Sequence, residues 1–455
     1  MKGLEEAAEF IRSKDNFHLI CHYDADGLSA GGIAYTLLKR LGKKFDFKVV
    51  KGLDPSSMDE IMSDEGVFLF VDLGSSSLEV LEEKLEGREV CIIDHHKPSK
   101  ETSFVHFNPH LSGFDGAVEL SGSGATYLVA KKINEENKDL SGIALVGAVG
   151  DMQDKNGALV GLNRKILEDA VGEKIIKYSK DIRLYGRFTR PLPQFLAYSF
   201  EPAFPGLTAN ESACYQFLEH LGIEPKRNGK WVYYYELNAD EKRKLISGLY
   251  VYGRQVGVPD SFLNSLVGEV YELINEKEVQ LRDIKEFSTL LNACGRNGEG
   301  EIGVMVCAGD REEYLKKALA LLEQHRRNLR EAILYVQEEK GVKEKKNIYV
   351  LDTDKIKDTI IGTVAGMLYG AKVIKQNKPI IALSRDDEGM VKISGRGTNY
   401  LVRKGLDLGK AMKQVASEFE GAGGGHDVAA GARIKPEYKE QFVEKIDEVI
   451  GEQLL

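Results

Sequence analysis

Four short segments of the sequence carry side chains that could bind metal ions. They contain His22, Asp24 and Asp26 in the first, Asp72 in the second, Asp94-His95-His96 in the third, and Asp151 in the fourth. Carboxylates gathered in such numbers repel one another unless cations neutralise them. Imidazole and carboxylate together suit manganese, zinc or iron better than calcium, and two such ions about 3.5–4 Å apart form a hydrolytic centre.

Each segment by itself is common in proteins that bind no metal. An Asp-x-Asp-Gly is usually a turn, two adjacent histidines usually lie in a core or on a surface, and an Asp after a strand usually caps a helix. Here all four occur in order within one predicted α/β domain, and the first three follow apolar strands. This conjunction favours one shared site over four unrelated features.

The elements that would position these side chains alternate between strands and helices. We expect strands over 17–23, 45–50, 66–73 and 89–96, with helices over 28–42 and 76–87. This alternation predicts a parallel sheet with helices on both faces. Side chains that leave the carboxyl ends of neighbouring strands converge at one edge, where ligands bind. On extended backbone, Asp24 and Asp26 would point the same way.

The rest of the chain predicts a helical insert and a second α/β unit. Prolines cluster between 160 and 285, and the aromatic run around Trp231 fits core or partner packing better than base stacking. A strand over 302–309, a connector helix over 311–340, a polar linker over 341–347 and a smaller α/β unit follow. We predict domains over 1–160, 161–285, 286–340 and 345–455.

Composition restricts the class of protein. A chain of 455 residues is too long for one core, and its formal net charge of −9 argues against a broadly basic nucleic-acid coat. No apolar stretch approaches the roughly 20 residues that span a bilayer, and the acidic amphipathic start lacks a signal-peptide layout. Five scattered cysteines indicate buried free thiols in a reducing compartment. We expect a cytoplasmic protein with no membrane partner.

The sequence resembles the DHH phosphoesterase superfamily, which is named for the triplet at Asp94-His95-His96. The segment 291–296, LNACGR, with the Arg-rich stretch after it, is similar to the RecJ branch. The segments 394–397 (SGRG) and 423–431 (GGGHDVAAG) resemble the two motifs of the DHH-associated C-terminal domain. Segment 186–208 and the compact length look most like archaeal RecJ-type nucleases, including the GINS-associated nuclease. His22 departs from many bacterial RecJ proteins, which have Asp there, and Gly397 stands where Ser is common.

The resemblance implies the fold and the role of each site residue. The fold would be an N-terminal parallel-sheet DHH domain, a mostly helical insert, a long connector helix and a smaller C-terminal α/β DHH-associated domain. One metal ion would be held by His22, Asp24 and Asp72, and the other by Asp26, Asp72, His95 and Asp151. Asp94 would orient His95, and His96 would donate to the phosphate. The substrate-binding residues would be Arg296, Ser394, Arg396, Gly424, Gly425 and His426.

The Gly-rich run that contains Gly424 and Gly425 also has a direct physical interpretation. Bare backbone lets a nucleotide approach closely, and exposed amides can bind phosphate oxygens. A flexible loop explains such a run equally well when it is taken alone. Its pairing with Arg396 on a preceding strand end favours phosphate binding, because guanidinium offers a planar bidentate fork.

The leading functional hypothesis is a two-manganese exonuclease, with magnesium as the alternative metal. It would hydrolyse single-stranded DNA in the 5′-to-3′ direction, and RNA as a second substrate, in replication or repair. The alternatives are an oligoribonuclease or cyclic-dinucleotide phosphodiesterase of the same superfamily, and a non-catalytic RecJ-like scaffold of a replicative helicase complex. The insert favours a longer strand path, and the complete ligand set favours catalysis. Binding to the GINS complex is implied by the resemblance alone.

Overall fold

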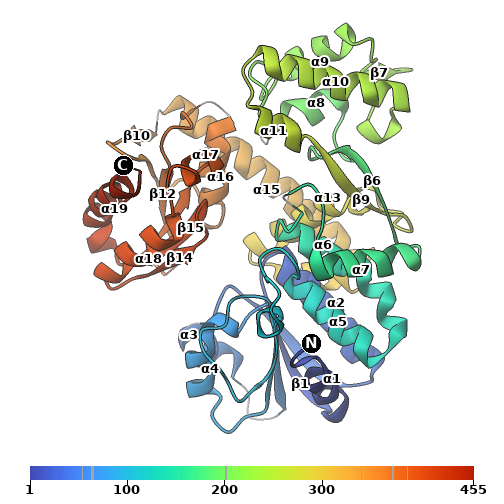
Figure 1. Cartoon of the computed structure of the whole chain (residues 1–455), viewed down its shortest axis with the longest axis vertical. Coiled ribbons are helices and arrows are strands. Elements are labelled where there is room, and N and C mark those ends of the chain that lie inside the picture. Colours follow the sequence, from blue (N-terminus) through green and yellow to red (C-terminus); the bar gives the residue numbers. More distant parts are fainter. Residues whose placement is uncertain are drawn as a thin grey trace. The chain divides into compact units, whose positions relative to one another are not determined.

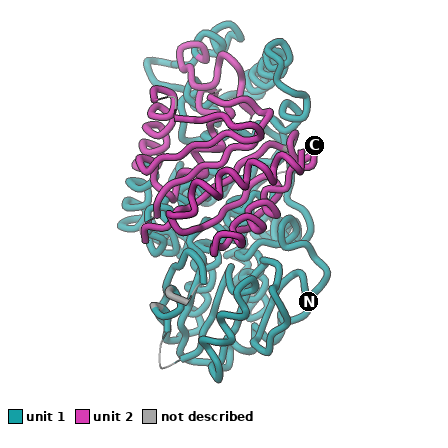
Figure 2. Tube along the Cα trace, turned by 90° about the vertical axis from the view of Figure 1, so that its left-hand side faces the viewer, with its two compact units in different colours: residues 1–195, 215–323 teal, residues 196–214, 324–455 magenta. Residues whose placement is uncertain are grey.

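The computed structural model describes residues 1–53, 55–62, 66–154, 156–199, 202–339, 341–370, 373–386 and 388–454. The chain forms two compact units, one made of residues 1–195 and 215–323, the other of 196–214 and 324–455 (Figure 2). The end of the predicted connector helix at Lys340 lies outside the described residues, as do residues 200–201 of the predicted insert.

The first unit is built on a five-stranded parallel sheet (Figure 1). Its order is β2-β1-β3-β4-β5, formed by β2 (Lys44–Val50), β1 (Asn16–His22), β3 (Val67–Val71), β4 (Val90–Ile93) and β5 (Val105–Phe107). The predicted parallel α/β fold is therefore confirmed. The three-residue strand β5 was not predicted, because a run this short carries no periodic signal.

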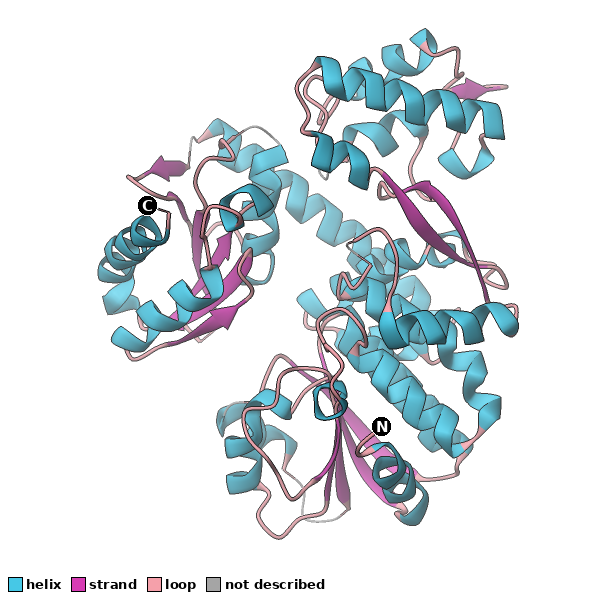
Figure 3. Cartoon of the chain, viewed as in Figure 1, coloured by secondary structure: helices cyan, strands magenta, loops and turns pink. Residues whose placement is uncertain are grey.

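Helices bury both faces of this sheet (Figure 3). Leu19 and Leu69 belong to a core with helices α1 (Leu4–Ser13), α2 (Ala25–Arg40) and α5 (Gly122–Ile133). Phe68 and Phe70 face the other way, into a core with α3 (Pro55–Ile61) and α4 (Leu78–Lys84). Burial on both faces explains why these strands are unbroken apolar runs rather than alternating ones.

Further helices pack on α2 at the first face. These are α6 (Ser141–Gly150), with α7 (Gly161–Gly172) behind it, α13 (Ile284–Arg296) and α14 (Gly300–Cys307). The prediction of a strand over 302–309 is wrong, because residues 302–307 lie in α14 and a turn follows. A short apolar run fits a buried helix as well as a strand. In the structure this run packs as a helix closely against α2, since a Cβ on Gly32 of α2 would lie 2.3 Å from the Cβ of Cys307.

Within the predicted insert, residues 161–285, an antiparallel pair is formed by β6 (Ile176–Ile182) and β9 (Val267–Leu273). Between them in sequence lie α8 (Leu192–Ala197), α9 (Glu211–His220), the hairpin β7 (Lys226–Arg227) and β8 (Lys230–Trp231), α10 (Ala239–Gln255) and α11 (Asp260–Ser265). The predicted helical character is confirmed. Tyr234 is fully buried, whereas Trp231 is 44% exposed with the Lys226 ammonium over its ring.

The second unit contains a mixed six-stranded sheet. Its order is β10-β11-β12-β13-β15-β14, formed by β10 (Val342–Glu344), β11 (Tyr349–Asp352), β12 (Ile380–Arg385), β13 (Val391–Arg396), β15 (Ala429–Ile434) and β14 (Ala422–Gly425). Only β11 and β12 pair in parallel among these described strands. One core includes α16 (Asp358–Gly370) and the end of α15 (Glu313–Glu338), and the other includes α18 (Leu408–Glu418) and α19 (Lys439–Gln453).

Two segments of this unit differ from their sequence interpretation. The linker predicted over 341–347 contains the edge strand β10, and the Gly-rich run contains the edge strand β14. Neither segment shows strand propensity, because one is charged and the other is nearly all glycine. Pairing with a single neighbouring strand determines both, which is a tertiary effect that local composition does not reveal.

A buried charged cluster joins the start of α13 to residues 187–189, which follow β6. Arg187 Nε donates to Asp283 Oδ2 at 2.7 Å. Glu286 Oε1 accepts from the backbone N of Phe188 at 2.9 Å, and its Oε2 accepts from the Thr189 hydroxyl. Burial and the charge of Asp283 raise the pKa of Glu286 to about 7. The anionic form of Glu286 is therefore disfavoured in the folded chain.

We expect Glu286→Gln to stabilise the chain at pH 8 but not at pH 5. A carboxyl whose folded pKa is raised binds its proton more tightly in the folded state, so stability falls as pH rises from the unfolded pKa, near 4.5, to about 7. Gln keeps an acceptor for Phe188 without the charge. The free energy of unfolding in urea should rise by about 1–3 kcal/mol at pH 8. The exposed Glu83→Gln is the control, and equal gains at both pH values would contradict the assignment.

Candidate metal centre

Three neighbouring strands deliver the acidic segments to one edge of the first sheet. Cys21 pairs with Val71, and Val71 pairs with Ile93, so the next residue of each strand, His22, Asp72 or Asp94, leaves the sheet at the same level. Asp72 has a φ of 62°, in the left-handed region. This conformation costs on the order of 1 kcal/mol and is tolerated by Asp better than by most residues. The backbone turn thus contributes to where the Asp72 carboxylate points.

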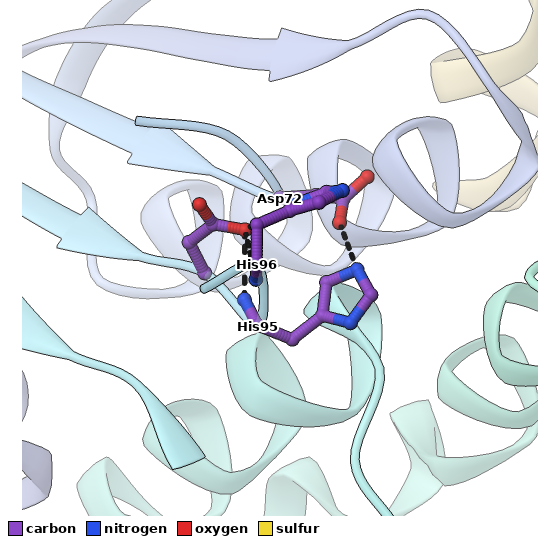
Figure 4. Close-up of side chains that lie close together, drawn as sticks. Asp72, His95 and His96 are labelled. Carbon is purple, nitrogen blue, oxygen red and sulfur yellow. Dashed lines mark hydrogen bonds and ion pairs between the residues drawn. The ribbon is translucent and has the colours of Figure 1, made fainter. Parts of the chain in front are cut away.

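The Asp72 carboxylate is the most constrained group of the site. It is 1% exposed, and neither oxygen has a hydrogen-bond partner among the described residues. Its Oδ1 lies 3.2 Å from His95 Nε2 (Figure 4). Its Oδ2 lies 3.6 Å from His22 Nδ1. A buried carboxylate costs several kcal/mol unless positive charge compensates it. Asp72 therefore lies between two imidazoles, in the position predicted for a shared ligand.

The potential ligand atoms form groups with the spacing of a coordination sphere. Within each group the atoms lie within 4.8 Å of one another, in the sets His22, Asp24 and Asp72, then Asp26, His95 and Asp151, and a third of Asp72, Asp94, His95 and His96. Ligands about 2.1 Å from an octahedral ion are about 3 Å apart. The 3.1 Å from His22 Nδ1 to Asp24 Oδ2 fits this value. The donor set therefore fits divalent ions that accept both nitrogen and oxygen.

Asp24 and Asp26 belong to different groups of potential ligands, so the expectation that their side chains point the same way is wrong. Asp24 has extended backbone and caps α2, with its Oδ1 accepting from Gly27 N at 3.0 Å. Asp26 lies one residue inside the helix, where successive side chains diverge by about 100°. The helix start therefore separates two carboxylates that a strand would have aligned.

The amino end of α5 holds Asp26 and makes room for Asp72. Asp26 Oδ2 accepts from Gly122 N at 2.7 Å, and its Oδ1 accepts from Ser123 N at 3.0 Å and from the Ser123 hydroxyl. A Cβ on Gly122 would lie 2.1 Å from Asp72 Oδ1, so only glycine fits there. Free amides at a helix start favour anions. The Ser-Gly-Ser-Gly run at 121–124, before an apolar helix, carried this signal but was not predicted to be functional.

The contacts of Asp94 in the DHH triplet differ from those that were predicted. Asp94 Oδ1 accepts from His95 N at 2.7 Å and from His96 Nδ1 at 2.8 Å, and its Oδ2 accepts from Ser75 N at 2.9 Å. The His95 ring is oriented by the Gly116 carbonyl instead, at 2.7 Å from Nδ1. With Nδ1–H donating to Gly116, Nε2 of His95 is left as the ligand nitrogen. Asp94 therefore orients the imidazole of His96, not that of His95.

Burial and neighbouring charges shift the pKa values of the carboxylates and histidines of the site. Burial and the charge of Asp72 raise the pKa of Asp26 well above its usual range. Burial lowers the pKa of His95, but the contact with Asp72 and the charges of the nearby carboxylates raise it well above its usual range. Burial also lowers the pKa of His96, and the charge of Asp94 outweighs this, raising it to about 9. The His96 side chain is 46% exposed, and its contact with Asp94 favours the protonated imidazole.

The segment LNACGR packs directly on the first acidic segment. Asn292 Oδ1 accepts from Ala25 N at 3.1 Å, and a Cβ on Gly295 would lie 1.7 Å from the Tyr23 carbonyl oxygen. Burial lowers the pKa of Arg296, while Tyr23 and Asp24 oppose that shift through their charge. The end of α13 therefore brings Arg296 near a predicted metal ligand.

The C-terminal substrate-binding residues lie in the second unit. Ser394 pairs with Gly431, and Gly431 pairs with Gly424, so these three positions share one face of the sheet, with Arg396 two residues along β13. A Cβ on Gly362 of α16 would lie 3.0 Å from Ser394 Oγ and 2.8 Å from Arg396 Nη2. Nothing lies within 4 Å of a Cβ on Gly424. The side chains of Ser394 and Arg396 therefore lie directly against the backbone of α16 at Gly362. Gly425 ends β14 and His426 follows it.

Comparison with known proteins covers the whole chain. The family models named DHH family N-terminal domain, DHH-CID domain and DHHA1 domain match residues 16–148, 184–267 and 345–452. Uncharacterized protein MJ0831 of Methanocaldococcus jannaschii is 34% identical over 471 residues, with 100% of this chain and 99% of the relative covered.

Two solved structures share the fold. RecJ in complex with Mn²⁺ from Thermus thermophilus is 18% identical with a TM-score of 0.61, and the match covers 99% of this chain but only 55% of that one. CDC45 from Entamoeba histolytica is 13% identical with a TM-score of 0.67, and the match covers 99% of both chains. At these identities the similarity concerns the fold alone. None of the described helices is long and apolar enough to cross a membrane.

We expect Asp72→Ala to abolish the stabilisation of the protein by Mn²⁺. The change removes the one carboxylate that both histidines face, so it should weaken metal binding by more than the about 10–100-fold that loss of an outer partner costs. Thermal melting of the metal-free chain should be unchanged or raised, because a repelling buried charge disappears. An upward shift with Mn²⁺ as large as that of the parent would refute the shared-ligand assignment.

Proposed function

The chain belongs to the DHH phosphoesterase superfamily and has a RecJ-like fold, and from this membership we propose that it is a divalent-metal-dependent exonuclease. Its substrate would be single-stranded DNA, with RNA as a second substrate, digested from the 5′ end. The observation that carries the proposal is the buried Asp72 carboxylate between His22 and His95. A scaffold without catalysis does not need to keep such a costly group.

The residues of the site have distinct proposed roles. His22, Asp24 and Asp72 would hold one ion, and Asp26, Asp72, His95 and Asp151 the other. Two Mn²⁺ ions, or Mg²⁺ in their place, would supply an activated water and polarise the phosphate. Asp94 accepts from Nδ1 of His96 and raises the pKa of that imidazole, so His96 would donate to a non-bridging phosphate oxygen.

The second unit would bind the end of the strand. Ser394, Arg396, Gly424, Gly425 and His426 would contact a terminal 5′ phosphate. Arg296, which belongs to the first unit, is proposed separately as a phosphate-binding residue. The open backbone at Gly424 lets a phosphate approach the sheet closely. Recognition of a dianionic terminus favours guanidinium, which forms two parallel charge-assisted hydrogen bonds.

A non-catalytic role is the second candidate, and one comparison favours it. The CDC45 structure matches 99% of this chain at a higher TM-score than RecJ. The ligand groups favour catalysis, because all eight residues of the four acidic segments come together at one sheet edge. Association with the GINS complex of the replisome is proposed from the RecJ resemblance alone and is compatible with either role.

The proposal predicts Mn²⁺-dependent release of nucleotides from 5′-labelled single strands. The purified full chain should be incubated with end-labelled single-stranded DNA, RNA, blunt duplex DNA and a cyclic dinucleotide. Digestion of the single strands should exceed that of the duplex, and binding should fall by roughly a decade per decade of salt for each phosphate neutralised. Equal rates on duplex and single strand would exclude strand selectivity. Turnover of the cyclic dinucleotide alone would favour the short-substrate alternative.

Arg396→Ala should selectively slow digestion of 5′-phosphorylated DNA. A charge-assisted hydrogen bond contributes about 1.5–3 kcal/mol, so the rate ratio of 5′-phosphate to 5′-hydroxyl substrate should fall about tenfold or more. Mn²⁺ binding should be unchanged, because Arg396 is no metal ligand. Arg385→Ala, at the exposed end of β12, is the matched control. An unchanged ratio in Arg396→Ala would remove the 5′-pocket assignment and reopen the polarity of digestion.

A further inference from the structure

A buried pair of amide side chains lies behind the second ligand group. Gln153 is 2% exposed and follows Asp151 just beyond the end of α6, and Asn163 is fully buried in the first turn of α7. Asn163 Nδ2 donates to Gln153 Oε1 at 2.5 Å. None of the four acidic segments includes either residue. Buried amides of this kind are stable only when their donors and acceptors are satisfied.

The Gln153 amide contacts one proposed ligand, Asp151, and the carbonyl group that orients another, His95. Its Nε2 donates to Asp151 Oδ2 at 2.8 Å and to the Gly116 carbonyl at 2.8 Å. The same carbonyl fixes Nδ1 of His95 at 2.7 Å. Because a carboxylate and a carbonyl only accept, the NH₂ end of Gln153 must face them. A different orientation of this one amide would release Asp151 and disturb the partner of His95.

Asn163 extends the network to the third ligand of the group. Its Oδ1 lies 3.5 Å from Ser121 N, and Ser121 Oγ lies 3.0 Å from Ser123 Oγ. The Ser123 hydroxyl donates to Asp26. A continuous chain of buried polar groups therefore links Asn163 to Asp26 through two serines. The ligands reached from the amide pair are those of one group, Asp26, His95 and Asp151.

We propose that Gln153, oriented by Asn163, is a positioning residue for the second metal ion. This inference rests on the proposed two-metal function. Gln153 would not touch the ion or the substrate, and would act by holding the Asp151 carboxylate and the Gly116 carbonyl in place. Partners of this kind set the direction of ligand lone pairs, and their loss lowers metal affinity about 10–100-fold. Among the described contacts the amide pair does not reach His22 or Asp24, so mainly one ion should be affected.

The first test titrates the metal-free full chain with Mn²⁺ and counts free Mn²⁺ by electron paramagnetic resonance. Gln153→Met removes the amide and nearly keeps its length. In this variant one of two Mn²⁺ ions should bind about 10–100-fold more weakly. At low Mn²⁺ the kcat on single-stranded DNA should fall and the KM for DNA should stay constant. Raising Mn²⁺ above the weakened constant should restore kcat, which it would not do for a merely structural defect.

A second variant reverses the polarity of the pair. In Asn163→Asp the new carboxylate can only accept, so Gln153 would turn its NH₂ end toward it and present Oε1 to Asp151 and Gly116. Asn163→Asp should therefore bind the second Mn²⁺ more weakly than Asn163→Ala. Asn137→Ala is the matched control, since Asn137 is a buried amide that donates to the Ala130 carbonyl at 2.8 Å, remote from the ligands. It should lower the melting temperature and leave both Mn²⁺ constants unchanged.

The outcomes separate the positioning role from the function on which it rests. A parent chain that binds no pair of Mn²⁺ ions would overturn the proposed function itself. A parent that binds two ions, beside Gln153→Met and Asn163→Asp variants that bind both as tightly, would overturn the positioning role alone. Loss of kcat in Gln153→Met that added Mn²⁺ does not restore would also overturn it.

Discussion

The architecture of the first unit depends on keeping one carboxylate buried without a hydrogen-bond donor. Neither oxygen of Asp72 has a hydrogen-bond donor among the described residues, so both oxygens stay available for the metal ions that are proposed to bind there. Three parallel strands bring His22, Asp72 and the DHH triplet to one edge. A left-handed turn at Asp72 and a glycine at position 122 then give the carboxylate its direction and its space.

The surrounding polar groups are arranged so that their donors bind the other carboxylates and leave Asp72 free. Asp26 accepts from the amino end of α5, and Asp94 accepts from the backbone of its own triplet and from Ser75. Each of these bonds fixes a neighbour of Asp72 without competing for its oxygens. Because Asp26 and Asp94 are held in place by these hydrogen bonds, the Asp72 carboxylate between them can remain without a hydrogen-bond donor. An unfavourable local arrangement persists only when the surrounding structure determines it in this way.

The sequence predicted the sheet and its acidic edge well because both depend on local signals. Uninterrupted apolar strands predict burial on both faces, and residues that follow parallel strands must share an edge. It did not predict β14, the helical nature of 302–309, or the role of Gly116, because each of these depends on a partner distant in sequence. Asp24 and Asp26 were misjudged because the helix begins at Ala25, three residues before the predicted start at residue 28, so Asp26 lies in the helix and not on extended backbone.

The charge of the proposed centre explains why an imidazole fits at position 22. The proposed ligands include four carboxylates, Asp24, Asp26, Asp72 and Asp151, whose charge two divalent ions would neutralise. A fifth carboxylate in place of His22, as in many bacterial RecJ proteins, would leave the site with an excess negative charge. A neutral centre neither repels nor strongly attracts a phosphate, so the incoming strand requires cationic partners of its own. In the proposed site, His96, whose pKa Asp94 raises, and Arg296, which interacts with the charge of Asp24, would supply this positive charge without acting as ligands. Binding of the metal ions and attraction of the substrate are thereby assigned to different side chains.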